Sequence, residues 1–172
     1  MLQGVSQAIE RNGQLRWSHW ERGATGSKVA VFRYEIPLEK SLYEVEFCCT
    51  PDRDWTTFYE RYVGYHGAIA IDPLSGAILR LEWIADLPST TPMAWSEIAI
   101  EYGAVDIAGK TYVCPLRSIS IVRGRSVSHL ALWDESFTTY GPFTTMLNDI
   151  SFSGYHVFRS DSRIVPGFDP TN

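Results

Sequence analysis

Apolar and polar residues alternate with a period of two along most of this chain, a pattern typical of β-strands that have one buried and one exposed face. In "VAVFRYEI", Phe32 and Tyr34 share one face while Arg33 and Glu35 share the other. The alternation resumes after a short turn in "LYEVEFCC", where Cys49 falls on the apolar face. We predict that these two segments pair as an antiparallel hairpin.

A second hairpin is predicted in "GAIAIDPLSGAILRLEWIADL", which joins two alternating segments through a turn at residues 72–76. Proline fixes φ, aspartate accepts hydrogen bonds from the turn backbone, and glycine tolerates a positive φ. In the exit strand, Leu79, Leu81 and Trp83 alternate with polar residues, so we expect these three side chains on one face. Calcium binding at this turn is not favoured, because it needs more oxygen ligands at defined spacing.

A third and longer hairpin is predicted in "SEIAIEYGAVDIAGKTYVCPLRSISIV", with its turn at residues 108–110. The apolar phase changes at Gly103, as expected of a β-bulge, and changes again beyond Pro115 in the second strand. These matched breaks predict a strongly curved sheet. From residue 124 to 147 the alternation fades while Ser, Thr, Gly and Pro accumulate, so this segment, 124–147, is predicted to be a long loop or flap.

The predicted fold class is mainly β, a curved antiparallel sheet or half-barrel with little helix. A chain of 172 residues can bury one core without disulfides, so we expect residues 1–172 to form a single β domain. The aromatic fraction of 13% agrees, because aromatic side chains favour strands. A net charge of −5 argues against a nucleic-acid partner, and no apolar run is long enough for a transmembrane segment.

The three cysteines limit the chemistry that this chain can support. Cys48 and Cys49 are neighbours on a predicted strand, so they point to opposite faces and cannot jointly bind a metal without distorting it. CxxC and CxxH spacings are missing, and zinc needs four properly spaced ligands, so we predict no metal and no cofactor. Cys49 and Cys114 both fall on apolar faces, either as buried small hydrophobic residues or joined in a disulfide.

Catalysis is not supported by any local motif. The histidines lie outside any nucleophile elbow, and the glycines do not form a phosphate-binding loop; the histidines are His19, His66, His129 and His156. A cysteine and histidine nucleophilic pair stays open, because such a site is recognised by a geometry that sequence does not display. The sequence therefore favours a protein that is not an enzyme.

Several stretches of the chain carry a resemblance to known proteins. The succession resembles an uncharacterised family of bacterial, mainly acidobacterial, envelope-type proteins across residues 15–166; its stretches are "AVFRYEIP", "YEVEFCC", "GYHGAIAIDPLSGAILRLEW", "IEYGAVDIAGKTYVCPLRSISI" and "LNDISFSGYHVFRSDSRI". The strand order is also similar to that of the outer-membrane lipoprotein carrier proteins, whose curved antiparallel sheet encloses an apolar cavity. The first resemblance implies longer members, so that this chain would be a C-terminal portion located in the periplasm or cell envelope. A cytoplasmic location is the alternative.

We expect a non-enzymatic envelope protein that binds an apolar ligand, a lipid or acyl chain, on the concave face of a curved sheet. The residues expected to line that face are Phe32, Tyr34, Leu79, Leu81 and Trp83. The alternative is a protein-interaction or structural module with a packed core and no ligand. Such a module would hold an envelope partner by an exposed sheet edge or by the segment 124–147. Alternation cannot separate these hypotheses, because a packed face and an open face have the same pattern.

Overall fold

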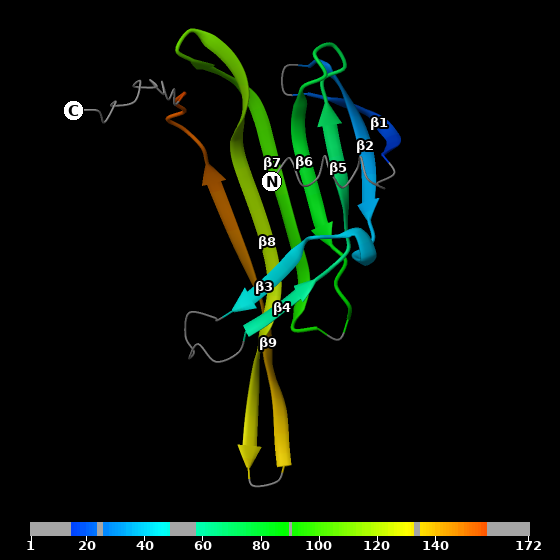
Figure 1. Cartoon of the computed structure of the whole chain (residues 1–172), viewed down its shortest axis with the longest axis vertical. Coiled ribbons are helices and arrows are strands. Elements are labelled where there is room, and N and C mark those ends of the chain that lie inside the picture. The colour runs from blue at the N-terminus through cyan, green and yellow to red at the C-terminus, as the bar shows by residue number, and fades with distance from the viewer. Residues whose placement is uncertain (1–14, 24–25, 49–57, 90, 133–134, 158–172) are drawn as a thin grey trace, which may run out of the picture.

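The computed structural model describes residues 15–23, 26–48, 58–89, 91–132 and 135–157. These residues form β-strands and one 3-10 turn, without an α-helix (Figure 1). In chain order the elements are β1 (Arg16–Arg22), β2 (Lys28–Ile36), η1 (Leu38–Lys40), β3 (Glu44–Cys48), β4 (Phe58–Tyr62), β5 (Tyr65–Ile71), β6 (Ile78–Ala85), β7 (Met93–Ile107), β8 (Lys110–Leu132) and β9 (Glu135–Ser151). The predicted mainly β fold with little helix is therefore confirmed.

Seven of the strands form one antiparallel sheet, which we call the main sheet, in the order β1-β2-β5-β6-β7-β8-β9. β3 and β4 form a separate two-stranded sheet that lies across the main sheet in Figure 1. The main sheet is open and is not strongly curled, with β1 and β9 as its outermost described strands. The antiparallel sheet is thus as predicted, whereas a half-barrel is not formed.

The predicted pairing of "VAVFRYEI" with "LYEVEFCC" is wrong. β2 pairs with β1 and β5, while β3 pairs with β4. The apolar face of β3 is used in a different way, because Val45 and Phe47 are buried against the main sheet instead of continuing it beside β2. The other two predicted hairpins, β5 with β6 and β7 with β8, are confirmed.

The segment 124–147 is not a long loop or flap. It forms the end of β8 and most of β9, which pair from Arg117 with Ser151 to Leu132 with Glu135. The far end of this hairpin projects beyond the other strands (Figure 1). Serine and threonine are compatible with strands, and Pro142 is tolerated because β9 lies at the edge of the main sheet.

One face of the main sheet packs against β3 and β4, and we call it the hairpin face. Val45 and Phe47 are buried there with Ala85 and Met93. The close approach requires Gly124 of β8, because a Cβ atom at that position would lie 2.4 Å from Phe47 Cε2. Phe47 therefore fixes the place where the small sheet crosses the large one.

A larger apolar cluster continues along the hairpin face. Its buried members are Tyr34, Ile36, Tyr65, Ile69, Leu81, Trp83 and Ile100. Tyr34 Oη donates a hydrogen bond of 2.7 Å to the Glu82 carbonyl oxygen, which lies beyond Gly67 of the intervening strand. Burial raises the pKa of Tyr34 well above 10.0, so the phenol stays protonated and able to donate. This hydrogen bond couples β2 to β6 across β5.

A bulge in β6 moves one predicted lining residue to the other side of the main sheet. Ala70 pairs with Arg80, but the next pair joins Ile71 with Ile78, which leaves Leu79 as the extra residue. Leu79 packs with a small cluster on the face opposite to the hairpin face, whereas Ile78 packs on the hairpin face. The prediction that Leu79 shares a face with the other lining residues of β6 is wrong for this reason.

Candidate functional site

The predicted lining residues divide into three environments. Tyr34, Leu81 and Trp83 are buried together in the large cluster of the hairpin face. Phe32 is half-buried on the same face, two residues from Tyr34 along β2, and Leu79 lies on the opposite face. Only Phe32 is therefore both on the predicted face and accessible to a ligand.

Phe32 belongs to a group of aromatic rings in mutual contact, which we call the aromatic patch; its members are Trp17, Trp20 and Phe32. The Trp17 ring is 4.9 Å from the Trp20 ring and 5.5 Å from the Phe32 ring, in edge-to-face arrangements. Trp17 and Trp20 are 49% and 52% exposed, although large aromatic side chains are usually mostly buried. The patch adjoins the core cluster, because Phe32 pairs with Ile69 of β5.

The two tryptophans reach the same face because β1 is irregular. The register with β2 shifts between Trp17 and His19, so that Trp17 pairs with Phe32 and Trp20 pairs with Ala30. A regular strand would send residues three apart to opposite faces. The alternation in "LRWSHWERG" is too weak to place either tryptophan on a face, so neither is among the predicted lining residues. The sequence signal for the aromatic patch is the presence of two tryptophans only three residues apart.

A positive charge lies at the margin of the aromatic patch. The Lys28 ammonium nitrogen is 6.0 Å from the centre of the Trp20 ring, at the outer limit of a cation–π contact. Lys28 is exposed, so its charge is also available to a negatively charged group in solution. The patch thus combines an apolar surface with a cation beside it.

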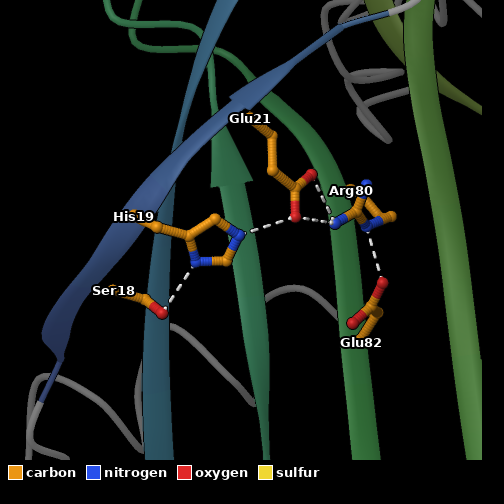
Figure 2. A network of polar contacts seen from close by, with 5 residues as sticks. All are labelled: Ser18, His19, Glu21, Arg80 and Glu82. Atoms are coloured by element: carbon orange, nitrogen blue, oxygen red, sulfur yellow. Dashed lines mark hydrogen bonds and ion pairs between the residues drawn. The ribbon is translucent and has the colours of Figure 1, made fainter.

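The face opposite to the hairpin face carries a polar network that joins β1 to β6 (Figure 2). Ser18 Oγ lies 2.9 Å from His19 Nδ1, and His19 Nε2 lies 3.0 Å from Glu21 Oε1. Arg80 Nη2 donates to both carboxylate oxygens of Glu21, at 2.9 and 3.2 Å, while Arg80 Nε lies 2.6 Å from Glu82 Oε1. Since β2 and β5 lie between β1 and β6 in the sheet, the network spans two strands.

The serine, histidine and glutamate of this network have the composition of a hydrolase triad, but their arrangement favours a structural role. Glu21 is bound through both oxygens to Arg80, and this hydrogen bonding is the main reason that its pKa is lowered. Both oxygens of the Glu21 carboxylate therefore take part in an ion pair between strands that are not neighbours in the sheet. His19 is also about half exposed on the outermost strand, where water competes for its hydrogen bonds. We interpret the network as a clamp that holds β1 on the sheet.

Removal of the guanidinium should weaken this clamp. We expect Arg80→Met to lower the free energy of unfolding by about 1 kcal/mol at pH 7 and low salt, and by less in concentrated salt. The pKa of Glu21 is lowered in the folded state, so its contribution is present above the ordinary value of 4.5 and is lost as pH falls through the folded pKa. Urea unfolding at pH 7, in low and in concentrated salt, measures the loss of stability and its salt dependence. The same measurement at pH 3 gives the pH dependence.

The matched control is Arg33→Met, which removes an exposed arginine of β2 from the same face. Arg33→Met should leave both the stability and its pH dependence nearly unchanged. Equal effects of the two substitutions at both pH values would contradict the clamp.

Three carboxylates gather on the small sheet. Oxygens of Glu44, Glu46 and Glu60 lie within 4.8 Å of one another, and the cross-strand pair is Glu46 with Glu60. A hydrogen bond shared with Glu44 is the largest cause that raises the pKa of Glu60. Glu44 and Glu46 alternate along one face of β3, whereas nothing in the sequence pattern places Glu60 beside them, because alternation does not identify β4 as their neighbour. An exposed acidic cluster alone does not define a metal site, since hard cations need more oxygen ligands in a fixed geometry.

Cys114 is half-buried on β8, opposite Gly103 of β7, and forms no disulfide with another described residue. Cys49 lies outside the described residues, so its burial and a disulfide with Cys114 stay predictions. Among the histidines, His66 Nδ1 contacts Asp86 Oδ1 at 2.7 Å on the surface.

Comparisons of the chain with protein-family models, with curated proteins and with solved structures find no match. The class that the structure defines is a mainly antiparallel β-sheet protein, with an open main sheet and a small sheet packed on one face. Within the described residues, helices that are long and apolar enough to cross a membrane are missing.

Proposed function

We propose that this protein is a non-enzymatic envelope protein that binds an apolar ligand, a lipid or acyl chain, on the hairpin face of the main sheet. The observation that carries the proposal is the aromatic patch, in which two half-exposed tryptophans adjoin the buried core. In this arrangement Trp17, Trp20 and Phe32 contact the ligand. Tyr34, Leu81 and Trp83 form the packed floor beside them.

A bound ligand would remove apolar area of the two tryptophans from water. A tryptophan can bury about 150–250 Å² of surface, so covering the exposed half of each ring removes roughly 100 Å². At about 25 cal/mol per Å², the two rings together contribute about 5 kcal/mol before the cost of ordering the ligand. Micromolar binding corresponds to about 8 kcal/mol, so the rest of an acyl chain must supply the remaining contacts and offset the cost of ordering.

The charge beside the patch narrows the class of ligand. Lys28 is placed to pair with an anionic head group while the acyl chain lies on Trp20 and its neighbours. A fatty acid or an anionic lipid fits this combination better than a neutral hydrocarbon. The envelope location is part of the proposal and rests on the resemblance described for residues 15–166.

The proposal predicts that the tryptophans of the patch control binding of a fluorescent fatty acid, cis-parinaric acid. We expect the double variant W17S/W20S to bind this probe at least about tenfold more weakly than the unaltered protein, because the covered apolar area is lost. Trp95→Ser is the matched control, since Trp95 is a similarly exposed tryptophan of β7. Equal affinity of the double variant and the control would refute the proposal.

A further inference from the structure

β9, an outermost strand of the main sheet within the described residues, carries apolar and nearly uncharged side chains of its own between residues 143 and 151. Phe143, Leu147 and Ile150 are exposed, and Leu147 reaches 62% exposure. The sole ionisable side chain in this stretch is Asp149, and two hydrogen bonds of 2.6 and 2.8 Å from Arg117 hold it. Edge strands are ordinarily protected from pairing by charged side chains, and this stretch lacks that protection.

The opposite edge of the main sheet, formed by β1, is protected by charged side chains. β1 is short and places Arg16, Glu21 and Arg22 along its length, with Glu21 tied to β6. Such a strand resists the addition of another strand. β9 is therefore the edge that is suited to pairing.

The backbone of β9 has a regular set of outward groups. The Phe152 N–H donates to the Leu116 carbonyl at 2.9 Å, in the same register as the pair of Arg117 with Ser151. The direction of the backbone hydrogen bonds alternates along a strand, so the N–H and C=O groups of the even-numbered residues here point towards β8. The residues that direct N–H and C=O away from β8 are Phe143, Thr145, Leu147, Asp149 and Ser151. Pro142 has no N–H and ends this series.

We propose that a second copy of this chain pairs antiparallel with β9 along residues 143–151, around a two-fold axis at Leu147. Leu147 then lies opposite the partner's Leu147, and Thr145 lies opposite the partner's Asp149. Every outward N–H and C=O of the stretch gains a hydrogen-bond partner, and the two main sheets become one continuous sheet. The same edge thus supplies both sides of the interface.

Charge supports this register. Asp149 faces a threonine, and the two Asp149 side chains are four residues apart along the strand, or about 13 Å. A register centred on Asp149 would instead place like charges directly opposite each other, which is destabilising. On the face shared by the odd-numbered residues, the exposed Leu147 side chains cover each other at the axis.

Sedimentation velocity of the full chain over a concentration series tests the proposal, with Leu147→Lys and Leu147→Asp as variants. We expect the unaltered protein to dimerise, and each variant to raise the dimer dissociation constant about tenfold or more, since like charges meet at the axis. An equimolar mixture of the two variants should restore the dimer, because lysine then faces aspartate. Circular dichroism checks that each variant is folded.

The control is Leu74→Lys, because Leu74 is 94% exposed in the turn between β5 and β6 and lies away from β9. This variant should dimerise like the unaltered protein. A monomer at every concentration would overturn the proposal. A dimer that survives both Leu147 variants, or a mixture that stays monomeric, would also overturn it.

Discussion

Replacing Leu81 with alanine is expected to lower the free energy of unfolding by about 2–5 kcal/mol. Leu81 is 1% exposed and pairs with Ile69 on one side and with Ile100 on the other, all within the large cluster. Truncation leaves a cavity in a place where three paired strands prevent collapse. Denaturant unfolding followed by circular dichroism measures the change.

Leu74→Ala is the control for this experiment, because its side chain is almost fully exposed and its loss should change stability by less than about 0.5 kcal/mol. The comparison also bears on the function. If Leu81 lined an open ligand cavity, its truncation would remove few packing contacts. A loss as small as that of the control would therefore contradict the packed floor that we describe.

Gly67→Ala is expected to lower the free energy of unfolding by about 3 kcal/mol. A Cβ atom at this position would lie 1.9 Å from the Glu82 carbonyl oxygen and 2.8 Å from Tyr34 Oη. The first of these atoms belongs to the backbone of β6, so no rotamer change relieves the contact and the strands must separate. Thermal or urea unfolding of the purified variant tests this expectation.

Two further variants separate the causes of that loss. Gly76→Ala changes a glycine with φ +73° and open space around it, so it should cost only the conformational strain of about 1 kcal/mol. The double variant G67A/Y34F removes the phenol oxygen but keeps the backbone contact, and it should remain as unstable as G67A. Recovery of stability in the double variant would show that the phenol, and not the Glu82 carbonyl, is the obstacle.

The function that we propose depends on two adjacent parts of the hairpin face. Leu81 and Tyr34 give a rigid floor, while Trp17 and Trp20 remain accessible beside it. This differs from the expected lining, in which all candidate residues faced a ligand directly. The aromatic patch lies on β1 and β2, near one edge of the main sheet, and the interface proposed at β9 lies at the opposite edge. Ligand binding and dimerisation can therefore be tested independently.

Sequence patterns predicted some strand pairings and misassigned others for identifiable reasons. The hairpins at residues 72–76 and 108–110 were predicted because tight turns force neighbouring strands to pair. The pairing of β2 with β3 was wrong, since alternation identifies the buried face of a strand without identifying its neighbour. Alternation fails to identify the strands within 124–147, because the described side chains of β9, from residue 139 onward, are mostly exposed on both faces and lack the pattern of a half-buried strand.

The candidate site was predicted least well where a strand is irregular. Bulges after Trp17 and at Leu79 change which face the following residues occupy, and neither has a glycine or proline to mark it. A single extra residue reverses the phase of alternation. For this one reason, sequence alternation places neither Trp20 nor Leu79 on the correct face.

The sequence by itself determined the β class, the tight hairpins and the burial of Tyr34 and Leu81 as apolar positions, because alternation and turn chemistry act between residues close in the chain. Only the tertiary structure decided that β2 lies between β1 and β5, that β3 and β4 cross one face, and that Trp17 and Trp20 gather beside Phe32. Strands are joined by backbone hydrogen bonds, which are nearly the same for every residue. The choice of neighbour therefore depends on how whole faces pack, and no short stretch of sequence contains that information.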